Sequence, residues 1–251
     1  DPVDFTDPET IVMCARTGLA GDSVSWFYVS RSRGRRWDGP YAFAGLNLPI
    51  AARTDIVPLG FGHALFMLTT AKADGREGRV FCARTRDGGR SFDFVGFVGD
   101  ERAGYCIMPS SVRLGDGSVL TATRCADRAG RGWIEVFRAA DDGRRWRNIG
   151  VAVQNTGVGG NPPALALLGD GRLALAYGCR NEPFGMRMRL SADGGASWTD
   201  EVMLRSDGGT PDIGYPKVAV LNDGNLLVAY YFNEGAGRER YIAASRIHIA
   251  R

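Results

Sequence analysis

Several kinds of residue and pattern are scarce in this 251-residue sequence, and each scarcity narrows its interpretation. Only Lys72 and Lys217 are lysines, so arginine supplies nearly all of the 31 Lys and Arg residues. With 28 Asp and Glu interspersed among them, the net charge is only +3, which does not favour a nucleic-acid partner. The longest clear apolar run, Leu226 to Phe232, is far shorter than the roughly 18 residues that a membrane-spanning helix needs. The composition therefore indicates a soluble globular protein without a membrane span.

The sequence also lacks the short motifs of common catalytic and metal sites. It contains no G-x-S-x-G, P-loop or H-E-x-x-H motif, and it has two histidines in all. Its five cysteines have irregular spacings without a C-x-x-C pair, which predicts scattered core thiols rather than a zinc site or a disulfide framework. The start of the sequence lacks the basic and then apolar layout of a signal peptide. No metal and no cofactor are expected.

A repeat of about 53 residues is the strongest feature of the sequence. One motif carries Ser or Thr, Asp, Gly and a terminal aromatic residue at offsets 0, 2, 4 and 7. Its copies are SRSRGRRW (30–37, with Ser32 in place of Asp), TRDGGRSF (85–92), AADDGRRW (139–146, with Ala139 in place of Ser or Thr) and SADGGASW (191–198). An Asp-Gly pair with apolar flanks recurs in phase with it, starting at positions 116, 170 and 223.

Each Asp-Gly pair predicts a tight hairpin turn, because both residue types tolerate the backbone angles of such turns. The aspartate motif also predicts a turn, in which the Asp and Ser or Thr side chains bond the loop backbone and the aromatic residue packs inward. One repeat therefore contains strand a, an Asp-Gly turn, strand b, a variable loop, strand c, the aspartate motif and strand d. Four strands in this order predict a β-propeller blade and an all-β fold without long helices. We expect the four terminal aromatic residues, Trp37, Phe92, Trp146 and Trp198, to be buried alike.

These motifs resemble the Asp boxes of the sialidase (neuraminidase) superfamily, also called BNR repeats, over essentially the whole chain. The most specific stretch is DIGYPKVAVLNDGNLLVAYYFNEGAGRERYIAASRI, residues 212 to 247. The resemblance implies a single β-propeller with blade units near 1–47, 48–101, 102–156, 157–208 and 209–251. Sialidases have six blades. Here the first unit lacks a clear strand a and the last ends after strand c, so either the ends combine into one blade or an N-terminal portion is missing. The family's Arg-Ile-Pro motif is not present. A secreted or periplasmic location is also implied by resemblance alone.

The order of strands predicts where a site lies. The Asp-Gly turns and the Asp boxes share one end of the blades, so the variable b–c loops and d–a connections at the other end are the expected binding face. The resemblance implies that arginines there bind a sugar carboxylate and that a tyrosine acts as the nucleophile. We expect Tyr215 to be that nucleophile and Arg180 a carboxylate ligand. Four further substrate-binding candidates are Arg187, Arg240, Arg124 and Asn161.

The acids match the sialidase pattern less well. Asp22 occupies a first-blade b–c loop and is the candidate acid and base. The family often has a glutamate at the start of a strand a, where this sequence has Asn161; Glu182 and Asp212 are the alternative partners of the tyrosine. If Tyr215 and Arg180 share one mouth but no acid reaches Tyr215, anion binding without catalysis is favoured.

Three classes of function follow. The first is an exo-acting glycoside hydrolase of sialidase type that cleaves a terminal acidic sugar. The second is a glycan-binding propeller without catalysis, and the third is a protein-interaction scaffold, since propellers host unrelated functions. The sugar, the linkage, the stereochemical course and the oligomeric state are not determined by the sequence.

Overall fold

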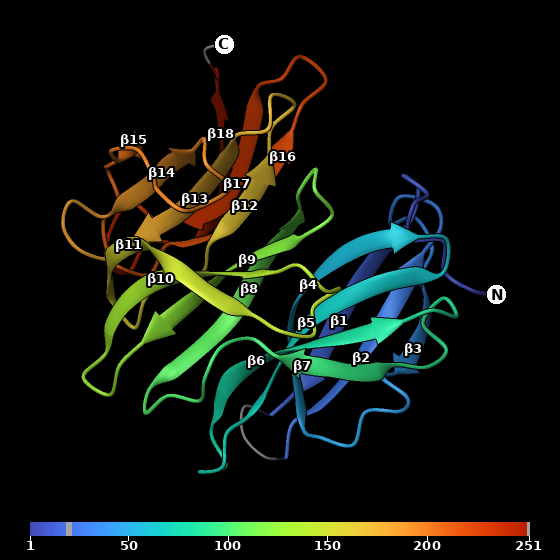
Figure 1. The fold of residues 1–251 in the computed structure, drawn as a ribbon. Helices are drawn as coiled ribbons and strands as arrows, with labels where there is room; N and C mark the ends of the chain where they lie inside the picture. Colours follow the sequence, from blue (N-terminus) through green and yellow to red (C-terminus); the bar gives the residue numbers. More distant parts are fainter. Residues whose placement is uncertain (19–21, 250–251) are drawn as a thin grey trace. The chain divides into compact units, whose positions relative to one another are not determined.

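The computed structural model describes residues 1–18 and 22–249, except for the side chains at positions 54 and 77. All regular structure in this part of the chain is β, as the sequence predicts, and none of it is helical. No segment of the described chain therefore qualifies as a membrane-spanning helix. The described residues contain eighteen strands, which form five antiparallel sheets that follow one another in chain order, from β1 to β18 (Figure 1).

The chain divides into two compact units. The first comprises Asp1–Arg102, Ile107–Pro109 and Ala139–Trp146. Its first sheet has three strands, β1 (Ile11–Thr17), β2 (Val24–Ser30) and β3 (Asp38–Ala42). Its second sheet has four strands, β4 (Ile50–Gly60), β5 (His63–Ala71), β6 (Glu77–Thr85) and β7 (Asp93–Phe97). An aromatic cluster of Phe27, Phe43, Phe66 and Phe92 forms much of the core of this unit.

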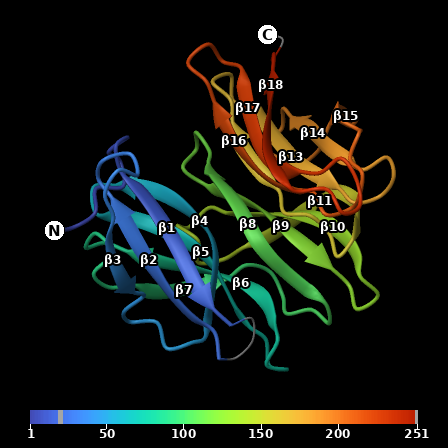
Figure 2. The ribbon, with the colours of Figure 1, turned by 180° about the vertical axis from the view of Figure 1, so that it is seen from behind.

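The second unit comprises Ala103–Cys106, Ser110–Arg138 and Arg147–Arg251. It holds most of one four-stranded sheet, β8 (Tyr105–Arg113), β9 (Val119–Ala126), β10 (Arg131–Ala139) and β11 (Arg147–Val158). The next sheet contains β12 (Ala164–Leu167), β13 (Leu173–Cys179), β14 (Gly185–Ser191) and β15 (Val202–Arg205). The last sheet has three strands, β16 (Gly214–Val220), β17 (Leu226–Phe232) and β18 (Tyr241–Ile247), drawn in orange to red in Figure 2.

These sheets have the strand order of propeller blades. Three sheets contain the full a, b, c and d set, and each pairs its strands in sequence order. The first sheet lacks strand a and the last lacks strand d within the described residues, as the sequence predicts. The fold is therefore an all-β propeller type with five blade sheets.

The Asp-Gly pairs form the predicted hairpin turns. In the first of them, the Leu114 amide bonds the Ser118 carbonyl at 2.8 Å, and the Asp116 carboxylate accepts the Ser118 amide at 3.0 Å. Gly117 has a φ of 83°, a left-handed conformation that other residues adopt only at a cost. The turns at 170–171 and 223–224 repeat this pattern, with the Arg172 and Asn225 amides bonded to the preceding aspartate.

The Asp boxes are turns held by their own side chains. In the fourth copy, the Asp193 carboxylate accepts the Ser197 hydroxyl at 2.5 Å and the Ser197 amide at 2.9 Å. Ser191 completes the turn, since its hydroxyl accepts the Gly195 amide and donates to Asp193. The Ser197 hydroxyl bond is the main reason that the pKa of Asp193 falls to about 2. The box at 85–92 makes the same bonds, and the pKa of Asp87 is also lowered to about 2.

The prediction that the four box aromatics are buried alike is wrong. Phe92 is 2% exposed because it has no polar atom and packs into the aromatic cluster of the first unit. Trp37 is 39% exposed, and its indole nitrogen bonds the Gly34 carbonyl within its own turn. Trp146 and Trp198 are partly buried. The box therefore fixes the turn in every copy, whereas the burial of its aromatic residue depends on what packs over each sheet.

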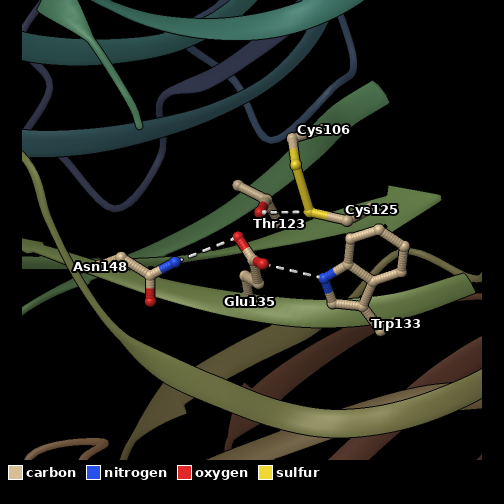
Figure 3. Close-up of a disulfide and its surroundings, with 6 residues drawn as sticks. All are labelled: Cys106, Thr123, Cys125, Trp133, Glu135 and Asn148. Carbon is tan, nitrogen blue, oxygen red and sulfur yellow. Dashed lines mark hydrogen bonds between the residues drawn. A yellow bond between two sulfur atoms is a disulfide. The ribbon is translucent and has the colours of Figure 1, made fainter. Parts of the chain in front are cut away.

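The prediction that all cysteines are core thiols is also wrong. Cys106 and Cys125 form a disulfide between the neighbouring strands β8 and β9 (Figure 3). The two residues lie at nearly equal distances from the Asp-Gly turn at 116–117, so the hairpin places them opposite each other with their Cα atoms 4.2 Å apart. Cys14, Cys82 and Cys179 are free, as the scattered pattern predicts.

Candidate functional site

Tyr215 is the second residue of β16 and is held there by its backbone. Its side chain is 41% exposed, and its φ of 51° is unusual for a residue with a side chain. The Tyr215 amide donates to the Asn161 side-chain oxygen at 3.2 Å, which helps to hold this conformation. Tyr215 therefore presents an accessible phenol from a fixed position.

Arg124, near the end of β9, reaches the Tyr215 hydroxyl with Nη1 at 3.1 Å. Its Nε and Nη2 atoms donate to the Gly159 carbonyl at 2.8 and 2.5 Å. The Tyr105 hydroxyl donates to the same carbonyl at 2.6 Å. Arg124 is 8% exposed, so its guanidinium is a cation in a largely buried and preorganised position.

Arg180 directly follows β13 and joins this group. Its amide donates to the Thr156 carbonyl at 2.9 Å, which ties its backbone to the end of β11. A Cβ atom built on Gly159 would lie 3.7 Å from Arg124 Nη2, 3.8 Å from Arg180 Nη1 and 3.8 Å from the Tyr105 hydroxyl. Two guanidinium groups and a phenol thus border the position over Gly159, and Arg180 Nε is buried without a hydrogen-bond partner among the described residues.

Asp212 and Tyr231 lie beside this group. Asp212 accepts the Tyr231 hydroxyl at 2.7 Å and Arg240 Nε at 2.8 Å. The bond from Tyr231 is the main cause that lowers the pKa of Asp212, and the charges of Arg240 and Arg180 add to it. Burial and the neighbouring Asp212 raise the pKa of Tyr231 to about 12, so this phenol stays protonated. The ring of Tyr231 lies 5.6 Å from that of Tyr215.

The structure thus brings together five of the sequence-predicted site residues. Arg124 and Arg180 lie beside Gly159, Tyr215 accepts a hydrogen bond from Arg124, and Asp212 forms an adjacent ion pair of 2.8 Å with Arg240. Among the residues that the structure describes, no carboxylate is hydrogen-bonded to the Tyr215 hydroxyl, whose partner is Arg124. The group is therefore cationic around its phenol, and the nearest acid is committed to Tyr231 and Arg240.

The other candidates have different surroundings. Arg187 is 4% exposed, because its Nε pairs with Glu201 at 2.8 Å and its Nη2 donates to the Pro183 carbonyl inside the β12–β15 sheet. Asn161 is fully buried, with its amide nitrogen on the Ile213 carbonyl at 2.8 Å. Glu182 is exposed in the loop after Arg180. Asp22 is exposed in the β1–β2 connection, in the first unit.

Sequence reasoning missed Tyr105, Gly159 and Tyr231. A usable signal exists for Tyr105. It is the first residue of a strand a, and Tyr215 is the second residue of another strand a, 110 residues later. This separation is about twice the repeat length. No pattern marks Gly159, whose φ of 70° shapes the d–a connection. In the sequence, nothing distinguishes Tyr231 from the other residues of its apolar strand. Its role follows from its hydrogen bond to Asp212, which only the fold brings beside it.

One group of three potential metal ligands occurs in the described part of the chain, Cys106, Cys125 and Glu135. Its two sulfur atoms are joined to each other, and a disulfide does not supply the thiolates that a metal ion binds. The residues around Gly159 are cations and phenols, which do not form a cation site.

Comparisons with known proteins agree with this architecture. A family model described as a BNR repeat-like domain matches residues 5–228. No curated protein sequence matches the chain significantly. Among solved structures, a protein of unknown function from Dyadobacter fermentans DSM 18053 is similar at 23% identity with a TM-score of 0.80, covering all of this chain and 76% of that one.

Two glycoside hydrolases are also similar in structure. A thermostable family-43 glycoside hydrolase has 14% identity and a TM-score of 0.64, with 100% of this chain and 89% of the other covered. An endo-arabinase from Bacteroides thetaiotaomicron VPI-5482 has 17% identity and a TM-score of 0.60, with 100% and 94% covered. At these identities the likeness establishes the fold. Since the Asp boxes, the blade sheets and the match over residues 5–228 coincide, this chain belongs to the BNR repeat-like domain family.

Proposed function

We propose that the protein recognises a terminal sugar that carries a carboxylate, at the group formed by Arg124, Arg180 and Tyr215. The observation that carries this proposal is the convergence of two guanidinium groups and the Tyr105 phenol on the space over Gly159. Guanidinium forks match the two oxygens of a carboxylate, and charge-assisted bonds to it are strong when the donors are preorganised.

We further propose that the protein acts on this sugar as a glycoside hydrolase of sialidase type. Similar folds occur in glycoside hydrolases, which supports carbohydrate chemistry on this scaffold. Tyr215 is the candidate nucleophile, because its exposed phenol adjoins the proposed carboxylate site and a neutral nucleophile avoids repulsion by that carboxylate. Arg124, bonded to the Tyr215 hydroxyl, would stabilise the phenolate during attack.

The second candidate is glycan binding without hydrolysis. One observation favours it: within the described residues, the Tyr215 hydroxyl has an arginine and no carboxylate as its hydrogen-bond partner. A tyrosine nucleophile needs a base to accept its proton, and Asp212 is already held by Tyr231 and Arg240. Binding of a carboxylate by the two arginines does not require such a base.

The two candidates are separated by measuring binding and turnover independently. Calorimetry with free sialic acid, glucuronic acid and neutral galactose tests recognition of the carboxylate. Release of a fluorescent leaving group from sialosides, glucuronides and arabinofuranosides, between pH 4 and 8, tests hydrolysis. We expect the acidic sugars to bind and galactose not to bind. Hydrolysis of an arabinofuranoside without binding of either acid would show that the carboxylate assignment is wrong.

Variants assign the roles. Arg180→Ala should weaken acidic-sugar binding roughly 10- to 150-fold, the equivalent of one charge-assisted bond of about 1.5 to 3 kcal/mol. Tyr215→Phe should abolish hydrolysis and leave most of the binding. Arg145→Ala, which removes an exposed guanidinium in the first unit, is the matched control and should change neither. Binding without turnover by the wild-type protein would select the second candidate.

A further inference from the structure

The Cys106–Cys125 disulfide adjoins the proposed site through its sequence neighbours. Tyr105 precedes Cys106 on β8, and Arg124 precedes Cys125 on β9. Both neighbours donate to the Gly159 carbonyl, and Arg124 also contacts the Tyr105 hydroxyl at 3.4 Å. Since side chains alternate along a strand, the disulfide and these two residues occupy opposite faces of the same strand pair. The cross-link therefore joins the two strands at the point from which Tyr105 and Arg124 extend.

The backbone around this cross-link is tightly packed. Cys125 is fully buried and Cys106 is 7% exposed. A Cβ atom on Gly104, just before β8, would lie 1.8 Å from the Ala126 carbonyl oxygen at the end of β9. A Cβ atom on Gly160 would lie 3.1 Å from the Cys125 carbonyl oxygen and 3.4 Å from Arg124 Cγ. A shift of either strand is therefore transmitted to the segment that carries Gly159.

The side chains around the sulfur atoms limit their freedom. Thr123 Oγ1 lies 3.4 Å from Cys125 Sγ. A carboxylate oxygen of Glu135 lies within 4.8 Å of both sulfur atoms. That carboxylate is itself fixed, since its oxygens accept Trp133 Nε1 at 3.0 Å and Asn148 Nδ2 at 3.2 Å (Figure 3). Figure 3 shows Glu135 directed at the disulfide from the neighbouring strand β10.

We propose that this disulfide is a redox-sensitive positioning device for the carboxylate site: the oxidised form holds Arg124 and Tyr105 in register on Gly159, and reduction weakens ligand binding. The inference rests on the proposed function and adds regulation to that site. Cys106 and Cys125 are positioning residues, since they act through Arg124 and Tyr105 and do not touch the ligand.

The chemistry requires a dithiol reductant. One thiolate of the reductant attacks a protein sulfur, the S–S bond breaks, and the second thiol of the reductant resolves the mixed disulfide. Two electrons pass to the protein, Cys106 and Cys125 each gain a proton, and the reductant leaves as its disulfide.

Reduction displaces the strands because two thiol sulfurs do not remain at bonding distance. They separate to van der Waals contact, and the packing around Thr123 and Glu135 leaves little room for rotation, so the strand pair widens. A misplacement of about 1 Å at a preorganised polar site is enough to lower its performance on the order of 100-fold. We therefore expect at least a tenfold loss of affinity.

The experiment compares oxidised protein with protein reduced by dithiothreitol, in EDTA so that no metal ion bridges the freed thiols. Affinity for free sialic acid is measured by calorimetry, and alkylation followed by mass spectrometry reports the state of Cys106 and Cys125. Cys106→Ala/Cys125→Ala should bind at least tenfold more weakly than the oxidised wild type and should not respond to dithiothreitol. Cys14→Ser, which removes a free thiol of the first unit, should keep both the affinity and the response.

Hydrogen exchange of residues 158–161 in the wild-type protein supplies a readout that needs neither a variant nor a ligand. Faster exchange after reduction is expected. Full reduction of Cys106 and Cys125 with unchanged affinity would overturn the inference while leaving the proposed function standing. If the oxidised protein binds no acidic sugar, the proposed function fails, and unchanged exchange of residues 158–161 would then overturn the redox coupling as well.

Discussion

Replacing Asn161 by alanine tests how the site is supported. This side chain is fully buried, and it bonds three backbone groups from two strands and their connections. Its amide nitrogen donates to the Ile213 carbonyl at 2.8 Å. Its oxygen accepts the Tyr215 amide at 3.2 Å and the Gly178 amide at 3.3 Å. Asn161→Ala removes all three bonds and leaves three buried backbone groups without these partners.

The magnitude follows from those bonds. Leaving a buried donor or acceptor unsatisfied costs about 1 to 3 kcal/mol, and the costs in one network are not additive. Cβ atoms on Gly178 and Gly214 would lie 2.8 and 2.3 Å from the Asn161 amide nitrogen, so the neighbouring backbone is packed directly on this side chain. A total loss of about 3 to 5 kcal/mol is expected, which lowers Tm by on the order of 10 °C in a chain of this size.

The assay is urea and thermal unfolding monitored by circular dichroism, with Asn181→Ala as the control. Asn181 bonds another side chain, Asn155, at 3.0 Å near the surface, and its loss should cost less than about 1 kcal/mol. We also expect Asn161→Ala to lose sugar affinity, because Tyr215 loses its backbone anchor. A loss of stability below about 1 kcal/mol would refute the assignment of Asn161 as the support of Tyr215.

Three further predictions concern the scaffold. Phe92→Ala should cost roughly 3 to 5 kcal/mol, and Trp37→Ala less than about 2, because only Phe92 is enclosed by the core; equal losses in denaturant unfolding would contradict this. The pKa of Asp193 lies at about 2, below its ordinary 3.8, so its contribution to stability is present above pH 4 and is lost as the pH falls toward 2; Asp193→Asn should make unfolding stability less pH-dependent in that range. Glu201→Gln should destabilise the fold by roughly 3 kcal/mol, since it leaves the buried Arg187 cation without its carboxylate, and a thermal shift under 2 °C would argue against this role.

Much of the fold was predictable because its signals are local. The Asp-Gly turns and Asp boxes satisfy their hydrogen bonds within a few residues, so the sequence motif alone determines the turn. Their spacing then determined the strand order and the incomplete first and last sheets. The disulfide was predictable too, because Cys106 and Cys125 lie on either side of the turn at 116–117. The irregular spacing of the five cysteines taken together gave no sign of it.

The partners of individual side chains were decided by tertiary structure. Arg180 and Arg187 look alike in sequence, yet Arg180 lies beside Gly159 and Arg187 is paired with Glu201 inside a sheet. The motif that contains Asn161 gave no indication that its amide bonds the backbone of Tyr215, 54 residues away. A turn is formed by neighbouring residues, so the local sequence determines it. A site is built from residues on different sheets, and its geometry depends on packing between strands that no local pattern specifies.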